Sequence, residues 1–401
     1  MQSSGCDSVG HDMTQQTQQC PGCHESVPAE VFCGACGAYL DRPVTLKYTL
    51  LRPSVFAAAP RQPITLPLVT SSLFPRLADS SRKPFRLALF LGLTALVICS
   101  WLQLVGPLVI VTAFGIPLLF VVYLRQSDAF ADIEFRALAL AIAIGVGTGF
   151  GWWLWAGARV ANSYGVPLGV GAQLSGSLDL GMIITAVGAL WMVFPAIVVR
   201  LLGWTSGESL DGFVIGALGA LSHAAAGTIT WFAPQFTAGL LQYYSPTRLF
   251  EEAFLYGLVD PITAAAAGGL IGLELWFRPN RRALRHPGRL RAALMIFTVA
   301  VLGLYIGVYA VDAAALPMAA EVGINTILMA LTLLTLRCAV QMALLHEEPD
   351  AATALPVPCP HCERTVPDTA FCQECGAAAR ASSRAWRRRR WALTGADRPA
   401  S

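Results

Sequence analysis

The run GMIITAVGALWMVFPAIVVRLL occupies residues 181–202 and carries one charged side chain, that of Arg200. A helix needs about 20 apolar residues to cross the hydrocarbon core of a bilayer, and this run supplies them. The sequence predicts an all-α polytopic membrane domain of about eight transmembrane helices, over residues 85–103, 106–124, 137–155, 181–202, 212–232, 253–277, 292–311 and 322–345. The first pair could instead be one re-entrant element over 85–124.

The composition of the whole chain indicates lipid as the solvent of most of it. Of the 401 residues, 55% are hydrophobic and 13% are charged, whereas a soluble globular domain carries about 25% charged residues. This balance excludes an ordinary soluble enzyme as a description of the whole chain.

Basic residues gather on one side of the predicted helices. The other side receives only Arg159 and Arg248, whereas the first receives Arg82, Lys83, Arg86, Arg125, Arg136, Arg200, Arg278, Arg281, Arg282, Arg285, Arg289 and Arg291. Short loops rich in Lys and Arg mark the cytoplasmic side. Because eight crossings return the chain to its starting side, we expect a multi-pass protein of the cell (inner) membrane with both termini in the cytoplasm.

Two short segments outside the membrane domain form an internal repeat. CPGCHESVPAEVFCGACGA begins at Cys20 and CPHCERTVPDTAFCQECGA begins at Cys359, and they align without a gap. Each contains two CxxC pairs separated by nine residues. A CxxC pair presents two thiolates from a tight turn, and two pairs close a tetrahedral site with no open position, which is typical of structural zinc.

These segments resemble the short zinc-ribbon family in the pattern CPxC…FCxxCG. We expect two structural zinc ions, with the ligand sets Cys20, Cys23, Cys33 and Cys36, and Cys359, Cys362, Cys372 and Cys375. Disulfides are the alternative, which a cytoplasmic location disfavours. A module of about 20 residues has almost no apolar core, so metal binding would supply its folding energy. Two such modules on one membrane face could also contact each other.

These features divide the chain into seven parts. They are a disordered segment (1–19), a first ribbon (20–40), a proline-rich linker (41–84), the membrane domain (85–345), a polar linker (346–358), a second ribbon (359–379) and a basic tail (380–401). The tail favours anionic lipid at the membrane surface, through Arg387, Arg388, Arg389 and Arg390. Four arginines are too few to specify nucleic acid, so no specific nucleic-acid partner is predicted.

The fourth to sixth predicted helices contain a second pattern. It runs WMVFPAIVVR (191–200), DGFVIGALGALSHAAAG (211–227) and DPITAAAAGGLIG (260–272). This pattern resembles the PrsW-like intramembrane metalloproteases, which have a Glu-Glu-x-x-Lys motif, an Asp-Gly-x-x-x-Gly helix and a histidine before glycine-rich turns. The matching scaffold residues are Pro195, Asp211, Gly212, Gly216, Gly268 and Gly272.

The catalytic residues of that family are missing from the matching positions. The Glu-Glu pair falls on Ala196 and Ile197, a later glutamate on about Gly227, and the histidine on Val259 or Asp260. The resemblance therefore implies a protease-like core that has lost its zinc ligands.

Ionisable residues inside a bilayer are costly and are functional candidates by default. The candidate intramembrane polar site comprises His223, Asp260, Arg200, Glu251 and Glu252. His223 and Asp260 are expected roughly 10–14 Å below the outer face, at 1.5 Å per residue, so they could meet. They could form a hydrogen-bonded pair that joins two helices, contact a ligand or ion, or hold zinc. Arg337, in the last helix, is expected to reach the interface or to pair inside the bundle.

The favoured function is a non-enzymatic membrane adaptor or scaffold whose ribbons recruit a cytoplasmic protein. An active intramembrane metalloprotease is the alternative, using His223, Asp260 and Glu251 or Glu252, although the missing motifs argue against an enzyme. A small-solute transporter using His223 and Asp260 is the third reading, weakened because no inverted repeat is visible.

Overall fold

The computed structural model describes residues 17–21, 25–35, 38–40, 79–126, 133–164, 178–204, 208–237, 245–279, 287–314, 316–347, 357–359, 362–367, 369 and 371–376. Cys23 and Cys36, most of the proline-rich linker and the basic tail with Arg387–Arg390 lie outside these ranges. The predictions made for those parts therefore stay predictions.

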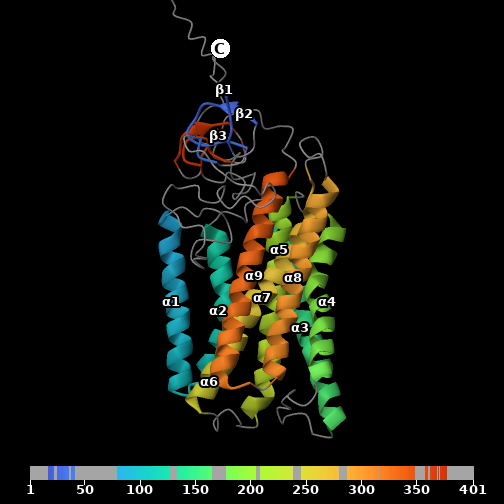
Figure 1. Ribbon diagram of the computed structural model, residues 1–401. Coiled ribbons are helices and arrows are strands. Elements are labelled where there is room, and N and C mark those ends of the chain that lie inside the picture. Colours follow the sequence, from blue (N-terminus) through green and yellow to red (C-terminus); the bar gives the residue numbers. More distant parts are fainter. Residues whose placement is uncertain are drawn as a thin grey trace, which may run out of the picture.

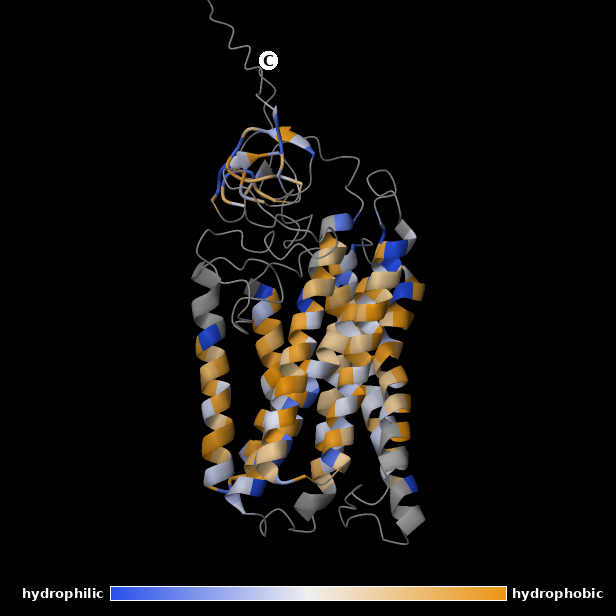
Figure 2. Ribbon diagram, in the orientation of Figure 1, coloured by the Kyte–Doolittle hydropathy of each residue, from blue (hydrophilic) through white to orange (hydrophobic). Residues whose placement is uncertain are grey.

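Long helices packed side by side form the body of the protein (Figure 1). They are α1 (Asp79–Trp101), α2 (Val105–Gln126), α3 (Phe135–Tyr164), α4 (Leu178–Leu202), α5 (Ser209–Thr237), α6 (Pro246–Phe254), the π-helical turn η3 (Leu255–Val259), α7 (Asp260–Trp276), α8 (Pro287–Ala313) and α9 (Met318–His346). In Figure 2 apolar residues dominate the lengths of the helices, and hydrophilic residues are concentrated near the two ends of the bundle. The protein is thus a multi-pass, mainly helical membrane protein.

Among the described residues, seven helical stretches are long and apolar enough to cross a membrane, and α1 adds a shorter apolar segment, Arg86–Trp101. α6, η3 and α7 form one continuous span, Pro246–Trp276. α1 and α2 are two separate helices, and Gln103 in the turn between them has a left-handed φ of 52°. The start of α1 and the end of α9 lie at the same end of the bundle (Figure 1). An even number of crossings is needed for this, so α1 counts as the eighth.

Two predicted boundaries differ from the structure by a few residues, and the polar linker contains a buried residue. α1 begins at Asp79, inside the expected linker, and includes Pro84 near its start, where few backbone N–H groups have a partner within the helix. Residues 17–19, expected to be disordered, form a strand because they pair with the residues that follow the first CxxC. Glu347, expected in the polar linker, is buried and accepts hydrogen bonds from the backbone N–H and the hydroxyl of Ser209, both at 2.8 Å.

α5 and α7 pack against each other at the centre of the bundle. Glycines on both helices allow their backbones to approach closely. A Cβ atom on Gly212 would overlap the carbonyl of Gly272, and one on Gly216 would overlap that of Gly268. The reverse also holds, because a Cβ on Gly268 would lie 2.6 Å from the carbonyl oxygen of Gly216. Small residues four apart let membrane helices approach in this way. The glycines that carry the protease resemblance therefore have a packing role here.

α5 is equally close to its other neighbours. On α3, Gly145 faces the carbonyl of Gly219, and a Cβ on Gly149 would lie 2.6 Å from the carbonyl oxygen of His223. The ring of Pro195 on α4 packs against Gly219 from another side. Most residues of α5 from Ser209 to Ala233 are buried, so α5 is the central helix.

Two small β-hairpins lie beyond the end of the bundle at which α1 begins and α9 ends (Figure 1). β1 (Thr17–Gln19) pairs antiparallel with β2 (Ser26–Pro28), and β3 (Val357–Pro358) pairs antiparallel with β4 (Thr365–Val366). Each hairpin brackets the first CxxC pair of its repeat, so the two repeats have the same local fold.

Candidate functional site

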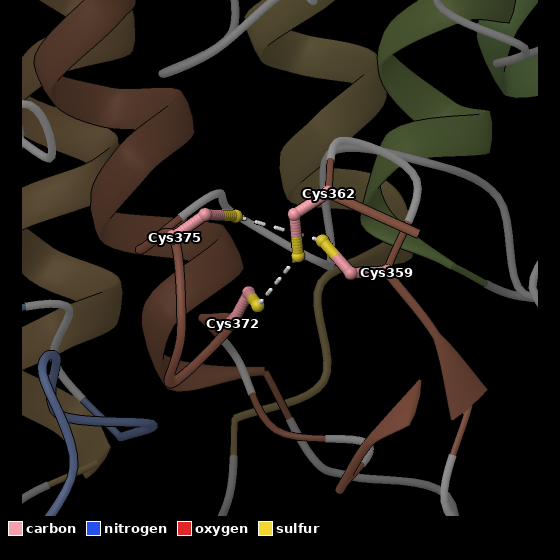
Figure 3. Close-up of side chains that lie close together, drawn as sticks. All are labelled: Cys359, Cys362, Cys372 and Cys375. Atoms are coloured by element: carbon pink, nitrogen blue, oxygen red, sulfur yellow. Dashed lines mark hydrogen bonds between the residues drawn. The ribbon is translucent and has the colours of Figure 1, made fainter. Parts of the chain in front are cut away.

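The four cysteines of the second repeat converge on one point (Figure 3). Their sulfur atoms all lie within 4.8 Å of one another. Cys359 Sγ is 3.7 Å from Cys375 Sγ, and Cys362 Sγ is 3.8 Å from Cys372 Sγ. A disulfide bond is about 2.0 Å long, so these pairs are not bonded. A tetrahedral ion with metal–sulfur bonds of about 2.3 Å requires sulfur–sulfur edges of about 3.8 Å, so the geometry fits a four-thiolate metal site.

Backbone turns aim these sulfurs inward. The N–H of Cys359 donates to the carbonyl of Arg364 at 2.8 Å and so closes the hairpin around the first pair. The N–H of Gly376 donates to the carbonyl of Cys372 at 2.7 Å, and Gly376 has a left-handed φ of 65°. Glycine adopts this conformation without steric cost, which explains the glycine directly after the last cysteine.

The first repeat has the same construction where it is described. The N–H of Cys20 donates to the carbonyl of Glu25 at 2.9 Å, the counterpart of the Cys359 bond in the second repeat. Cys20 and Cys33 are fully buried and pack in one apolar cluster with Val27 and Leu40. Cys23 and Cys36 lie outside the described residues, so the second metal site stays a prediction.

The two repeats join into one unit, as the sequence suggested they could. The N–H of Phe32 donates to the carbonyl of Gln373, and the N–H of Phe371 donates to the carbonyl of Gly34, both at 2.9 Å. Phe371 and Gln373 are the aligned counterparts of Phe32 and Gly34, so the contact is a pseudo-two-fold one, in which equivalent residues exchange equivalent bonds.

The side chains of these two phenylalanines also pack reciprocally, each against the other repeat. Phe371 is 3% exposed and belongs to the apolar cluster of the first repeat, around Cys20 and Cys33. The ring of Phe32 in turn lies against Gly376 of the second repeat, where a Cβ would approach Phe32 Cδ1 to 2.7 Å. We call this joined unit the head. Each repeat thus supplies part of the other's apolar core.

Inside the bundle, His223 of α5 is 2% exposed and contacts α3. Its Nδ1 lies 3.2 Å from Thr148 Oγ1, and that hydroxyl also bonds the carbonyl of Gly145 at 3.1 Å. This contact joins α5 to α3.

Asp260 is buried at the start of α7 and contacts α8. The hydroxyl of Tyr309 donates to Asp260 Oδ1 at 2.6 Å. The π-helical turn η3 ends at the residue before Asp260. Pro261 has no N–H to offer the carbonyl four residues earlier, which accounts for a wider turn at this point.

The remaining predicted site residues lie at the two ends of the bundle. Arg200, in the last turn of α4, donates from Nε to the carbonyl of Leu275 at 3.1 Å, and its guanidinium lies 5.3 Å from the centre of the Trp276 ring. Carbonyls in a helix's last turn have no partner in the helix, so an arginine is favourable there. Glu251 and Glu252 lie on α6, at the opposite end (Figure 1).

Glu251 belongs to an acidic cluster that the sequence analysis missed. Arg248 Nη1 donates to Glu251 Oε2 at 3.1 Å. Glu321 on α9 and Asp312 on α8 lie near Glu251. Glu251 and Glu321 are only 4% and 5% exposed. Glu251 lies on the short helix α6 and Glu321 in the first turn of α9, and these positions near helix ends were the available sequence signal.

The five predicted polar-site residues therefore do not form one site. His223 and Asp260 have different hydrogen-bond partners, and no described bond joins them, because the helices turn their side chains toward α3 and α8 respectively. Within the described ranges, the group of metal-ligating side chains that converges is the cysteine set of the second repeat. No protein-family model, curated protein or solved structure matches the chain.

Proposed function

We propose that the protein is a membrane-anchored adaptor whose zinc-ribbon head recruits a cytoplasmic protein. The observation that carries the proposal is the reciprocal pairing of Phe32 with Gln373 and of Phe371 with Gly34. It joins the two ends of the chain into one head at one end of the bundle. The eight-helix bundle then serves as the anchor that holds this head against the membrane.

Zinc is the metal that the head is proposed to hold. Four thiolates at tetrahedral spacing suit it, and a site with four protein ligands leaves no position for a substrate. The metal would thus have a structural role and fix the shape of the recruiting surface. Arg125 and Arg200 lie in the last turns of α2 and α4, which supports placing the head in the cytoplasm.

The contacts of the bundle support an anchoring role more than a protease or transporter role. A zinc protease needs several ligands and an open water position at one point, whereas His223, Asp260 and Glu251 bond to three different neighbours. His223 and Asp260 each connect two helices. The resemblance to PrsW-like proteases is consistent with a core that has kept helix packing and lost the chemistry.

The adaptor proposal is tested by cross-linking in intact cells. The full chain and its Cys20→Ser/Cys359→Ser variant are purified after cross-linking, and attached proteins are identified by mass spectrometry. We expect a cytoplasmic protein that is attached to the wild type and lost from the double variant. Cys338→Ser, which changes a cysteine of α9 outside the head, is the matched control and should keep it.

Gel filtration of the same samples shows whether the bundle still assembles. If both cysteine variants carry the same attached proteins as the wild type, the head does not recruit them, and the proposal fails.

A further inference from the structure

Arg337 is a cation inside the bundle without an anionic partner in the described part of the chain. It lies on α9 nine residues before His346, so its Cα is about 14 Å from that helix end. Arg337 takes no part in the ion pairs Arg136–Glu134, Arg248–Glu251 and Arg364–Glu374 of the described residues. An unpaired cation at such depth is costly, so a partner from outside the chain would stabilise it.

Arg337 lines a cavity whose other walls are almost wholly apolar. The cavity has a volume of about 290 Å³ and lies between α1, α2, α5, α7 and α9. Its walls include Leu119, Phe120, Leu258 and Leu333, and Arg337 is the one charged side chain among its described lining residues. This combination suits a ligand with an apolar body and a negative group.

A second cavity adjoins the first. It has a volume of about 280 Å³ and is lined by α1, α2 and the π-helical turn. The two share Leu89, Leu93, Ile116, Leu119 and Leu258 as lining residues. They therefore form a crevice with two lobes, which we call the α1 crevice. Its outer wall, α1, exposes Leu87, Phe90 and Leu91 and so faces the surrounding lipid.

We propose that the α1 crevice binds an anionic phospholipid of the bilayer, with acyl chains in the two lobes and the phosphate beside Arg337. The apolar walls match hydrocarbon. The guanidinium matches phosphate oxygens, which it can bind with two parallel hydrogen bonds. Arg337 lies in the half of α9 nearer the head, and a long arginine side chain can extend from there to the level of the lipid headgroups. This binding is independent of the adaptor role.

Thermal unfolding of the full chain in detergent tests the proposal. Dioleoyl phosphatidylglycerol, dioleoyl phosphatidylcholine and oleate are added separately at equal concentrations. We expect phosphatidylglycerol to raise Tm saturably and more than either other lipid. In Arg337→Gln its apparent affinity should fall about fivefold, the effect of one basic contact with an anionic lipid. Arg125→Gln, which changes an exposed arginine at the end of α2, should leave it unchanged.

Two more variants keep the test decisive if Arg337→Gln does not fold. Arg337→Lys retains the charge and should retain most of the phosphatidylglycerol effect. Ala265→Phe fills the first lobe and should weaken the effect with the charge intact. Equal stabilisation by phosphatidylglycerol and phosphatidylcholine would overturn the proposal. So would equal stabilisation by oleate, or a phosphatidylglycerol effect that survives in both Arg337→Gln and Ala265→Phe.

Discussion

The backbone N–H of Phe32 donates to the carbonyl of Gln373 at 2.9 Å and so joins residues from opposite ends of a 401-residue chain. The matching bond from Phe371 to Gly34 makes the contact reciprocal. An isolated repeat of about 20 residues has almost no apolar core, so on its own it would depend on a bound metal for its stability. In the head an aromatic ring of each repeat packs against the other repeat. Because of this, a change that destabilises one repeat should also destabilise the other.

Phe371→Ala should therefore weaken the first repeat as well as the second. Removing a buried phenylalanine costs about 3–5 kcal/mol, which is large for so small a unit. We expect zinc to transfer from the Phe371→Ala variant of the full chain to a coloured chelator several times faster than from the wild type. Val31→Ala removes an apolar side chain of the head that is 39% exposed, and it should leave the rate unchanged. Equal rates for Phe371→Ala and the wild type would mean that the repeats are independent.

Zinc content distinguishes a structural head from a metal site in the bundle. We expect two zinc ions per full chain by atomic absorption, one in Cys372→Ser and none in Cys33→Ser/Cys372→Ser. Four-thiolate zinc is bound tightly enough to survive purification without added metal. Zinc that persists in the double variant and disappears when His223→Ala is added would identify a metal site in the bundle and favour the protease alternative.

The contact of α5 with α7 should not tolerate a methyl group. Gly216→Ala would place a Cβ against the carbonyl of Gly268, and because the neighbour is backbone the helices must separate. We expect a loss of about 1–3 kcal/mol, measured by unfolding in mixed detergent and SDS. Gly147→Ala on α3 meets no atom within 4 Å and should be neutral or gain up to about 1 kcal/mol from helix propensity. Similar results for both variants would contradict the packing.

The spans could be predicted from the sequence because a run of apolar residues is a local property. All eight predicted helices overlap helices of the bundle. The partners of the polar residues could not be predicted, because hydropathy does not fix how a helix is rotated about its axis. His223 was expected near Asp260 but contacts Thr148, and Asp260 contacts Tyr309.

Glu347→Ala should loosen the end of the bundle that faces the head. The carboxylate accepts two hydrogen bonds from Ser209 in a buried setting, and a charged acceptor there contributes about 1.5–3 kcal/mol. We expect that loss in the same unfolding experiment. Glu134→Ala removes an exposed ion pair with Arg136, which is worth at most about 1 kcal/mol. If the two variants lose the same amount, the Ser209 contact contributes nothing specific.

Double-mutant cycles decide whether His223 and Asp260 act together. His223→Ala with Thr148→Val should show a coupling of about 0.6 kcal/mol, the average for a hydrogen bond between membrane helices. Asp260→Asn with Tyr309→Phe should show a similar value. His223→Ala with Asp260→Asn should show a coupling near zero, because residues without a shared partner contribute additively. A coupling above about 1 kcal/mol in this last cycle would mean that both side chains share a site, and the case for a transport or catalytic core would be restored.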